Sequence, residues 1–157
     1  MTATTAEHSP GSTLIHRLIA SRAGLAALAL RLPVGLIFMA HGSQKLFGLF
    51  GGHGLAGTAQ WMASVGIEPG YPLALAAGSA EFFGGLALLL GLLVRPAAAL
   101  LAFTMLVAIF SVHLPNGLFI SNNGYEYALS LLAVSVSLIF SGAGRLSLDR
   151  LLAQRLS

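Results

Sequence analysis

PLALAAGSAEFFGGLALLLGLLV, residues 72–94, is a run in which Glu81 is the only charged side chain. A helix needs about 20 predominantly apolar residues to cross the hydrocarbon core of a bilayer. Because a helix on the surface of a soluble protein keeps a charged face toward water, this run predicts a membrane-spanning helix. We therefore expect the fold to be organised around a lipid bilayer.

The composition of the whole chain agrees with this prediction. Of its 157 residues, 56% are hydrophobic and 8% are charged, against about 25% charged residues in soluble domains. The chain contains no cysteine, which excludes disulfides, thiolate metal sites and iron–sulfur clusters, so any redox role must borrow its electron carrier. The net charge of +3 comes mostly from arginines at the ends of apolar runs. That pattern is a topology signal, so we expect no nucleic-acid partner.

Three further apolar runs predict membrane-spanning helices, at residues 31–50, 97–113 and 125–140. Arg95, followed by a proline, separates the second and third spans by a tight turn, since proline suits the start of a helix better than its interior. The four runs together predict an all-α fold, an integral membrane four-helix bundle within a domain over residues 13–144.

The remaining segments have other compositions. Residues 46–71 are too rich in glycine for a span, and Trp61 suggests that this connection contains a short interfacial helix between spans one and two. Residues 1–12 are polar and small, which predicts a disordered tail. Residues 145–157 alternate leucines with charges, which predicts an amphipathic cytoplasmic tail.

The basic residues predict the orientation of the bundle. By the positive-inside rule, the side with more Lys and Arg faces the cytoplasm. The opposite side holds at most Lys45, so we expect both termini and the Arg95 turn to be cytoplasmic. The arginines on the expected cytoplasmic side are Arg17, Arg22, Arg31, Arg95, Arg145, Arg150 and Arg155.

Ionisable side chains within the expected spans identify a candidate functional site, because each costs several kcal/mol in a bilayer unless it finds a partner. Lys45 lies 14 positions after Arg31, and Glu81 lies 14 positions before Arg95. At about 1.5 Å per residue both are roughly 21 Å from the cytoplasmic boundary, so we expect them to pair. His41 is one helical turn below Lys45 and forms the floor of the cluster.

His113 and Glu126 lie at similar depths by the same count, about 27 and 24 Å, and are expected to meet. Glu126 continues into a stripe of small residues that predicts a packed interface, so we expect both Glu81 and Glu126 to point into the bundle. The result is a polar pocket in the outer half of the membrane. Its candidate ligand-binding residues are His41, Lys45, Glu81, His113, Asn116 and Glu126. The stripe consists of Ser130, Ala133, Ser137 and Ser141.

Simpler interpretations stay open for each member. Lys45 and Glu81 are equally consistent with a structural ion pair that fixes helix register. His113 and Glu126 could be hydrated helix ends, and His41 could be satisfied by a backbone carbonyl. Tyr127 is interpreted first as an aromatic residue of the membrane interface. The sequence identifies no catalytic residue, and we expect no metal site and no covalently bound cofactor.

Three stretches, RLPVGLIFMAHGSQKLFG (31–48), AEFFGGLALLLGLLVRPAA (80–98) and HLPNGLFISNNGYEYALSLL (113–132), occur in this order. With them, residues 30–152 resemble the DoxX family of small four-helix membrane proteins. The resemblance implies a multi-pass protein of the bacterial inner membrane. It also implies an association with membrane redox work, including subunits of thiosulfate:quinone oxidoreductase and partners of detoxifying redox enzymes.

Three functions are consistent with these observations. The first is a redox-associated subunit that binds a quinone or another small molecule in the pocket while a redox enzyme partner supplies electrons. If it is catalytic, it is an oxidoreductase subunit that depends on that partner or on quinone. The second is a transporter of a small solute or protons, and the third is a non-catalytic membrane scaffold. The sequence predicts no oligomeric state.

Overall fold

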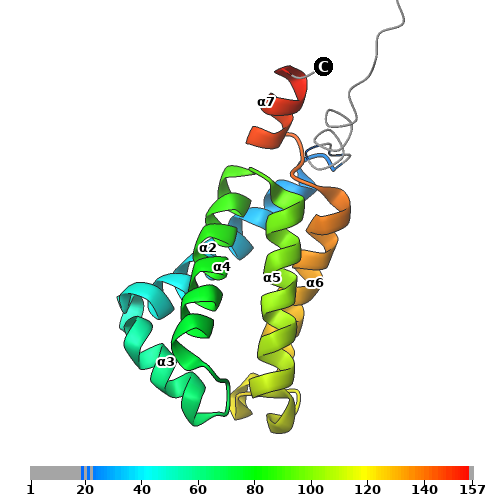
Figure 1. Cartoon of the computed structure of the whole chain (residues 1–157). Helices are drawn as coiled ribbons and strands as arrows, with labels where there is room; N and C mark the ends of the chain where they lie inside the picture. The colour runs from blue at the N-terminus through cyan, green and yellow to red at the C-terminus, as the bar shows by residue number, and fades with distance from the viewer. Residues whose placement is uncertain (1–18, 20, 22, 156–157) are drawn as a thin grey trace, which may run out of the picture.

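The computed structural model describes residues 19, 21 and 23–155, and every regular element in that part of the chain is helical. Figure 1 shows the long helices lying side by side, with α7 beyond one end of them. The expected tail at residues 1–12 lies outside the described residues. The main helices are α2 (Ala26–Phe47), α3 (Gly54–Ser64), α4 (Gly70–Leu90), α5 (Val94–Ala108), α6 (Glu126–Ser141) and α7 (Leu148–Arg155).

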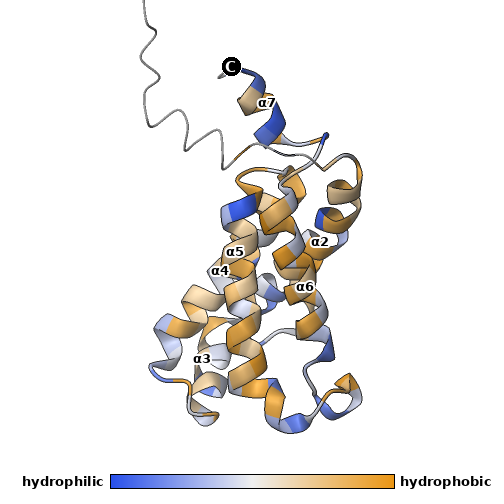
Figure 2. Cartoon of the chain, turned by 90° about the vertical axis from the view of Figure 1, so that its right-hand side faces the viewer, coloured by the Kyte–Doolittle hydropathy of each residue, from blue (hydrophilic) through white to orange (hydrophobic). Residues whose placement is uncertain are grey.

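Three of these helical stretches are long and apolar enough to cross a membrane: Ala26–Phe47, Gly70–Leu90 and Val94–Asn116. The third stretch includes α5 and its continuation through a π-helical turn, Ile109–His113. Helix α6 is apolar but shorter, at 16 residues. In Figure 2 hydrophobic residues cover the long helices and the hydrophilic residues gather toward their ends. The prediction of apolar membrane-spanning helices is confirmed for these three.

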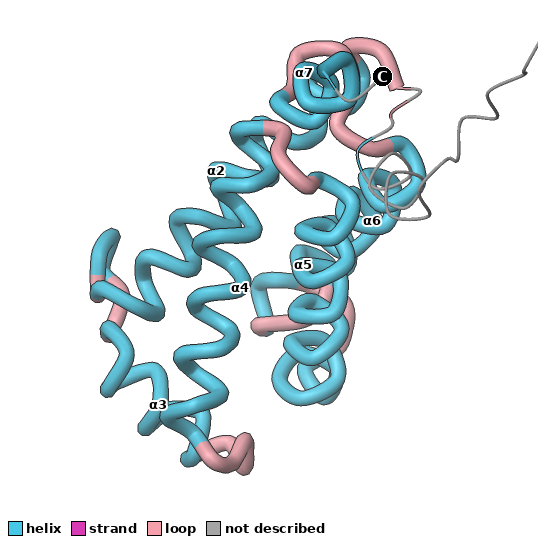
Figure 3. The backbone as a smooth tube through the Cα atoms, turned by 45° about the horizontal axis from the view of Figure 1, so that its top comes forward, coloured by secondary structure: helices cyan, strands magenta, loops and turns pink. Residues whose placement is uncertain are grey.

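Helices α2 and α4 form the most extensive helix pair, and glycines permit their close approach. A Cβ atom on Gly42 would lie 2.7 Å from the Cα of Phe82, and one on Gly85 would lie 2.6 Å from the carbonyl oxygen of Gly35. Backbones at this separation bring many atoms into dispersion contact, which is the main attraction between helices in lipid. Helices α5 and α6 form a second pair, and the short Gly91–Leu93 turn joins the two pairs through α4 and α5 (Figure 3).

Arginines at the end of the bundle nearest α7 cap helices instead of standing free. The guanidinium of Arg31, 2% exposed, donates hydrogen bonds to the carbonyls of Leu88 and Leu89 and to that of Leu146. These bonds neutralise the dipole at the end of α4. Arg31 itself lies inside α2 and not at its start. The first span therefore begins at Ala26, five positions before the expected boundary.

Arg95 and Asp149 extend this capping to the other helices. Arg95 donates hydrogen bonds to the last carbonyls of α6, those of Ile139 and Phe140. The buried carboxylate of Asp149 accepts hydrogen bonds from the backbone N–H groups of Leu93 and Val94, at the start of α5. Residues of the expected amphipathic tail thus hold α7 against the turn between α4 and α5.

At the other end, the short helix expected between spans one and two is present as α3. Its buried face, Ala59 and Met62, packs on Ala74 of α4 and forms a second small core. The opposite face is open, and Trp61 is 44% exposed. Helix α3 therefore packs along the first turns of α4 and closes that side of the bundle.

Candidate functional site

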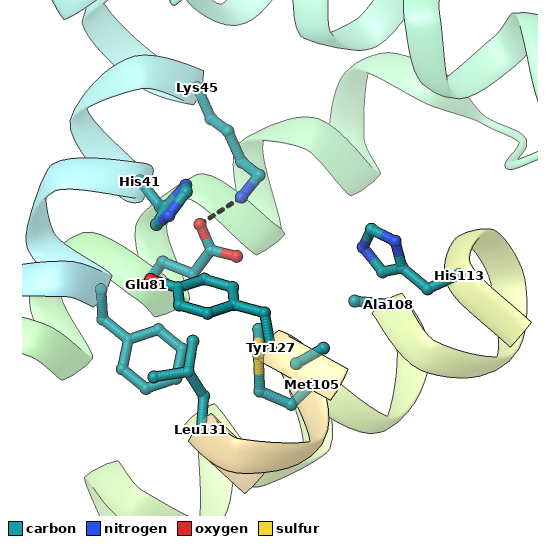
Figure 4. Close-up of a pocket in the computed structure, with 10 residues that line it drawn as sticks. His41, Lys45, Glu81, Met105, Ala108, His113, Tyr127 and Leu131 are labelled. Atoms are coloured by element: carbon teal, nitrogen blue, oxygen red, sulfur yellow. Dashed lines mark hydrogen bonds and ion pairs between the residues drawn. The ribbon is translucent and has the colours of Figure 1, made fainter. Parts of the chain in front are cut away.

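Lys45 and Glu81 form an ion pair between α2 and α4 (Figure 4). The Glu81 side chain is 4% exposed, whereas that of Lys45 is 26% exposed. The carboxylate is therefore the more deeply buried partner, and Lys45 supplies the positive charge that compensates it. Gly78 makes the approach possible, because a side chain there would collide with Leu46 and come within 3.2 Å of the Lys45 Cβ. The structure thus brings together the pair that the sequence predicts.

A partly open cavity of about 120 Å³ lies beside this pair and is enclosed by α2, α4, α5, the π-helical turn and α6. Most of its polar side chains gather around the ion pair, His113 lies across the space from them, and the remaining wall is apolar. Figure 4 shows these groups facing one another across the space. The cavity is lined by Phe38, His41, Lys45, Glu81, Met105, Ala108, His113, Tyr127, Ala128 and Leu131.

Tyr127 belongs to this cavity, although the sequence led us to place it at the membrane interface. Its ring lies 6.1 Å from that of His41, tilted by 55°. Figure 4 shows the ring extending from α6 toward His41 and Glu81. Tyr127 directly precedes Ala128 in the chain, and Ala128 lies on the buried face of α6.

His113 reaches the same cavity from the end of the π-helical turn. Its Nδ1 is 2.8 Å from the backbone carbonyl oxygen of Asn123. Because a carbonyl can only accept, Nδ1 carries the hydrogen, and in the neutral ring Nε2 is left as an acceptor. Single π-turns in helices are frequent at functional sites, since they change the direction of the following side chains.

Two of the six candidate residues serve the adjoining loop instead of lining the cavity. Asn116 donates hydrogen bonds to the carbonyls of Val112 and Asn123. The Glu126 carboxylate accepts a hydrogen bond of 2.6 Å from the N–H of Ile120. The expectation that Glu126 meets His113 in the pocket is therefore wrong. The loop uses the side chains of Asn116 and Glu126 to satisfy its own backbone.

The stripe that follows Glu126 also faces away from the bundle. Ser130, Ala133 and Ser137 are exposed, whereas the buried residues of α6 are Ala128, Leu131, Ser135 and Leu138. Ser130 satisfies its hydroxyl by donating to the Glu126 carbonyl four residues earlier. A hydroxyl bonded in this way needs no partner from another helix. The prediction that this stripe packs inside the bundle is wrong for these three residues, whereas Ser141, at the end of α6, is half-buried and its hydroxyl oxygen is buried.

The depth of the pocket also differs from the prediction. Glu81 lies near the middle of α4, which ends at Leu90, and the turn at Gly91–Leu93 separates α4 from Arg95 in the first turn of α5. Counting from Arg95 placed it too far out, because the turn adds residues that do not lie along the helix. The cavity therefore extends from the middle of α4 toward the loop end at His113.

A second, more open cavity of about 280 Å³ adjoins the first, and His41 and Lys45 line both. We call it the vestibule. It lies between the end of α2 and α3. Because Lys45 lines this open cavity and Glu81 does not, Lys45 is partly exposed whereas Glu81 is buried. Sequence reasoning did not assign these residues to a site: Gln44, Gly51, Gly52, His53, Thr58 and Trp61.

The fold and the cavity define a small helical membrane protein with a polar, partly buried intramembrane site. The DoxX family profile matches residues 26–114, and the chain belongs to the DoxX family. This confirms the resemblance drawn from its sequence motifs.

Relatives from three bacteria are similar over most of their length. The chain is 34% identical over 134 residues to “Inner membrane protein YqjF” of Escherichia coli, covering 82% of this chain and 92% of the relative. It is 33% identical over 125 residues to “Putative oxidoreductase CatD” of Bacillus subtilis, covering 80% and 85%. It is 33% identical over 150 residues to an uncharacterized membrane protein of Mycobacterium tuberculosis, covering 88% of each chain. No solved structure matches the chain. The protein is thus a multi-pass protein of the bacterial inner membrane.

Proposed function

We propose that the protein is a redox-associated membrane subunit that binds a quinone in the cavity beside Lys45 and Glu81. The observation that carries this proposal is a mostly apolar cavity inside the helices, in which two histidines, a lysine, a carboxylate and a tyrosine face one space. Such groups are costly at this depth and are usually retained for a ligand or for proton transfer. A membrane relative named as an oxidoreductase adds support.

The size of the cavity favours a single-ring head group. A buried cavity of about 150 Å³ is enough to hold benzene, and this one measures about 120 Å³ and is partly open. Its apolar wall, including Phe38, Met105 and Leu131, suits the faces of the ring. Its polar side suits two ring oxygens that need hydrogen-bond donors.

Donors and proton carriers are divided between the two sides of the cavity. Lys45 and Tyr127 can donate to a ring oxygen on the side of the ion pair, and His113 faces the cavity from the opposite side. Reduction of a bound quinone takes up two electrons and two protons, and a partner redox enzyme would supply the electrons. His41 and Lys45, which also line the vestibule, can pass protons between that open space and the ring oxygen.

In the same proposal, α2, α4, α5 and α6 form a four-helix membrane bundle with both termini in the cytoplasm. The capped end with Arg31, Arg95 and α7 would then be cytoplasmic, and the vestibule would face outward. A reporter that is active only in the periplasm, fused after Ser157, should give no signal. Strong activity of this reporter would show that the orientation is the opposite of the one proposed.

Transport of protons or a solute through the bundle is less well supported. Between the cavity and the capped end, the buried residues include apolar side chains such as Leu88, Leu101 and Leu138. Ser135, buried in the same region, bonds its hydroxyl to the Leu131 carbonyl. This layer favours a pocket over a path. A pure scaffold would have no need of the polar cavity.

The proposal predicts that a short-chain benzoquinone stabilises the purified protein. Ligand at about 100 times its Kd raises the free energy of unfolding by about 2.7 kcal/mol. For a chain of this size the melting temperature should rise by about 5 °C or more. Thermal unfolding in detergent at increasing quinone concentration measures the effect, with the redox-inert dimethoxytoluene ring as the control. A melting temperature that does not change with quinone concentration would refute the proposed function.

A further inference from the structure

An apolar groove of about 210 Å³ lies against α4 and α5 and is closed at one end by residues of α3 and of the segment that follows it. We call it the side groove. Its lining has no charged residue, and its one hydroxyl, on Thr104, donates to the Leu100 carbonyl. It therefore offers nothing to a polar head group and suits a hydrocarbon chain. Its residues are Met62, Ile67, Leu73, Ala76, Ala77, Ala80, Leu100, Phe103, Thr104 and Val107.

The side groove opens on a surface that would face lipid. Phe103 is 63% exposed and Val107 is 41% exposed, although both belong to an apolar helix long enough to cross a membrane. A hydrocarbon chain can therefore reach the groove sideways from the bilayer without crossing an aqueous phase.

The same two helices form the walls of the side groove and of the polar cavity. Ala80 lines the groove and the next residue, Glu81, lines the cavity; on α5 the neighbours Val107 and Ala108 are divided in the same way. Where α4 and α5 pack most closely, a Cβ on Gly84 would lie 3.0 Å from the Leu101 side chain.

About two helical turns beyond this contact, the boundary between the side groove and the polar cavity is thin. Counting along antiparallel helices from the Gly84–Leu101 contact sets Ala77 opposite Ala108. Ala77 lines the side groove and Ala108 lines the polar cavity, so the side chains on the two sides of the boundary at this level are methyl groups. A ligand with its head in the cavity and its tail in the groove would pass between α4 and α5 at this level.

We propose that the side groove holds the hydrocarbon tail of the quinone whose ring occupies the polar cavity, and that the ligand enters between α4 and α5. This inference rests on the proposed function and identifies the ligand as a tailed, lipid-soluble quinone. A phospholipid fits less well, because its charged head must stay at the membrane surface and would not occupy the polar cavity, which extends to Glu81 near the middle of α4. A quinone ring is uncharged and can reach that depth.

The experiment compares a quinone with and without a tail. The probes are ubiquinone without a side chain and decyl-ubiquinone, titrated into the full chain in nanodiscs. The variant V107W fills the groove, and V136W is the matched control, since Val136 is 38% exposed on α6 and lines neither cavity. Partition of the tailed probe into lipid is the same for both variants and cancels in the comparison.

We expect V107W to weaken decyl-ubiquinone binding by about tenfold, because several methylene groups lose their packing contacts. Binding of the tail-free ring should change by less than about twofold, and V136W should leave both affinities unchanged. Equal affinities of V107W and V136W for decyl-ubiquinone would overturn the inference while leaving the ring site intact. Failure of both probes to bind the natural chain would overturn the proposed function as well.

A second measurement does not depend on how a tryptophan variant folds. Decyl-ubiquinone that carries a diazirine on its tail should, on illumination, label the natural chain at side-groove residues such as Leu100 and Val107. Excess tail-free ubiquinone should remove this label by occupying the ring site. Labelling that is spread evenly over α5 and α6, or that survives the competitor, would show that bulk lipid contacts alone explain it.

Discussion

Replacing Gly42 by alanine is expected to lower the free energy of unfolding by about 3 kcal/mol. The new Cβ would lie 2.7 Å from the Cα of Phe82 and 2.8 Å from the carbonyl oxygen of Gly78. Both atoms belong to the backbone of α4, so no flexible side chain can move aside and α2 and α4 must separate. Thermal unfolding in detergent measures the loss.

Gly24 provides the matched control for this substitution. A Cβ there meets nothing within 4 Å, and its backbone conformation suits any residue. Gly24→Ala should leave stability unchanged or raise it by up to about 1 kcal/mol through the unfolded state. Equal stabilities of the Gly42 and Gly24 variants would show that the close α2–α4 seam does not exist in the folded protein.

The second large effect is expected at the Lys45–Glu81 pair and is asymmetric. Lys45→Met leaves the Glu81 carboxylate, 4% exposed, without its partner and should cost about 3–5 kcal/mol. Glu81→Gln should cost less, because Lys45 is 26% exposed and lines the vestibule, where its charge can be hydrated. The double variant should recover much of the loss.

A double-mutant cycle in detergent thermal stability measures this coupling. The Lys45→Met, Glu81→Gln protein has no uncompensated charge and keeps the size of both side chains, so it should fold. Additive losses would show that the two side chains do not interact, whatever the role of the cavity. A larger loss from Glu81→Gln than from Lys45→Met would contradict the burial order.

The main features of the fold could be predicted because lipid imposes them. Long uncharged runs must form helices whose backbone groups bond internally, and ionisable residues at matching depths must find one another. The Lys45–Glu81 pair follows from those two constraints. Family membership follows from the order of the motifs around Arg31, Glu81 and Arg95.

Several errors arise because a sequence does not give the rotation of a helix about its axis. Ser130 and its stripe suit a packed interface or an exposed face equally well, because each serine can bond to its own helix. Depth places Glu126 in the pocket and Asn116 is a further candidate there, but the loop before α6 needs both side chains for its backbone. Tyr127, one residue along, points to the cavity in their place.

Arg31 and Arg95 show a related difficulty at the other end. Both carry the charge that the positive-inside rule counts, yet both are used to cap helices. Their positions along the sequence therefore do not mark the membrane boundary, and depths measured from them are displaced. The two counts err in opposite directions, since Arg31 lies inside α2 and Arg95 lies beyond the end of α4, yet Lys45 and Glu81 still meet as an ion pair.

The central claim is that the cavity beside Lys45 and Glu81 binds a quinone ring through the polar side chains of that pair. Calorimetric titration of tail-free ubiquinone into the natural chain and into the Lys45→Met, Glu81→Gln variant tests it most directly, once unfolding data show that both are folded. We predict saturable binding to the natural chain and affinity at least about tenfold weaker in the variant, for the loss of a charge-assisted hydrogen bond. Equal affinity in the two proteins would contradict the claim and leave Lys45 and Glu81 as a purely structural ion pair.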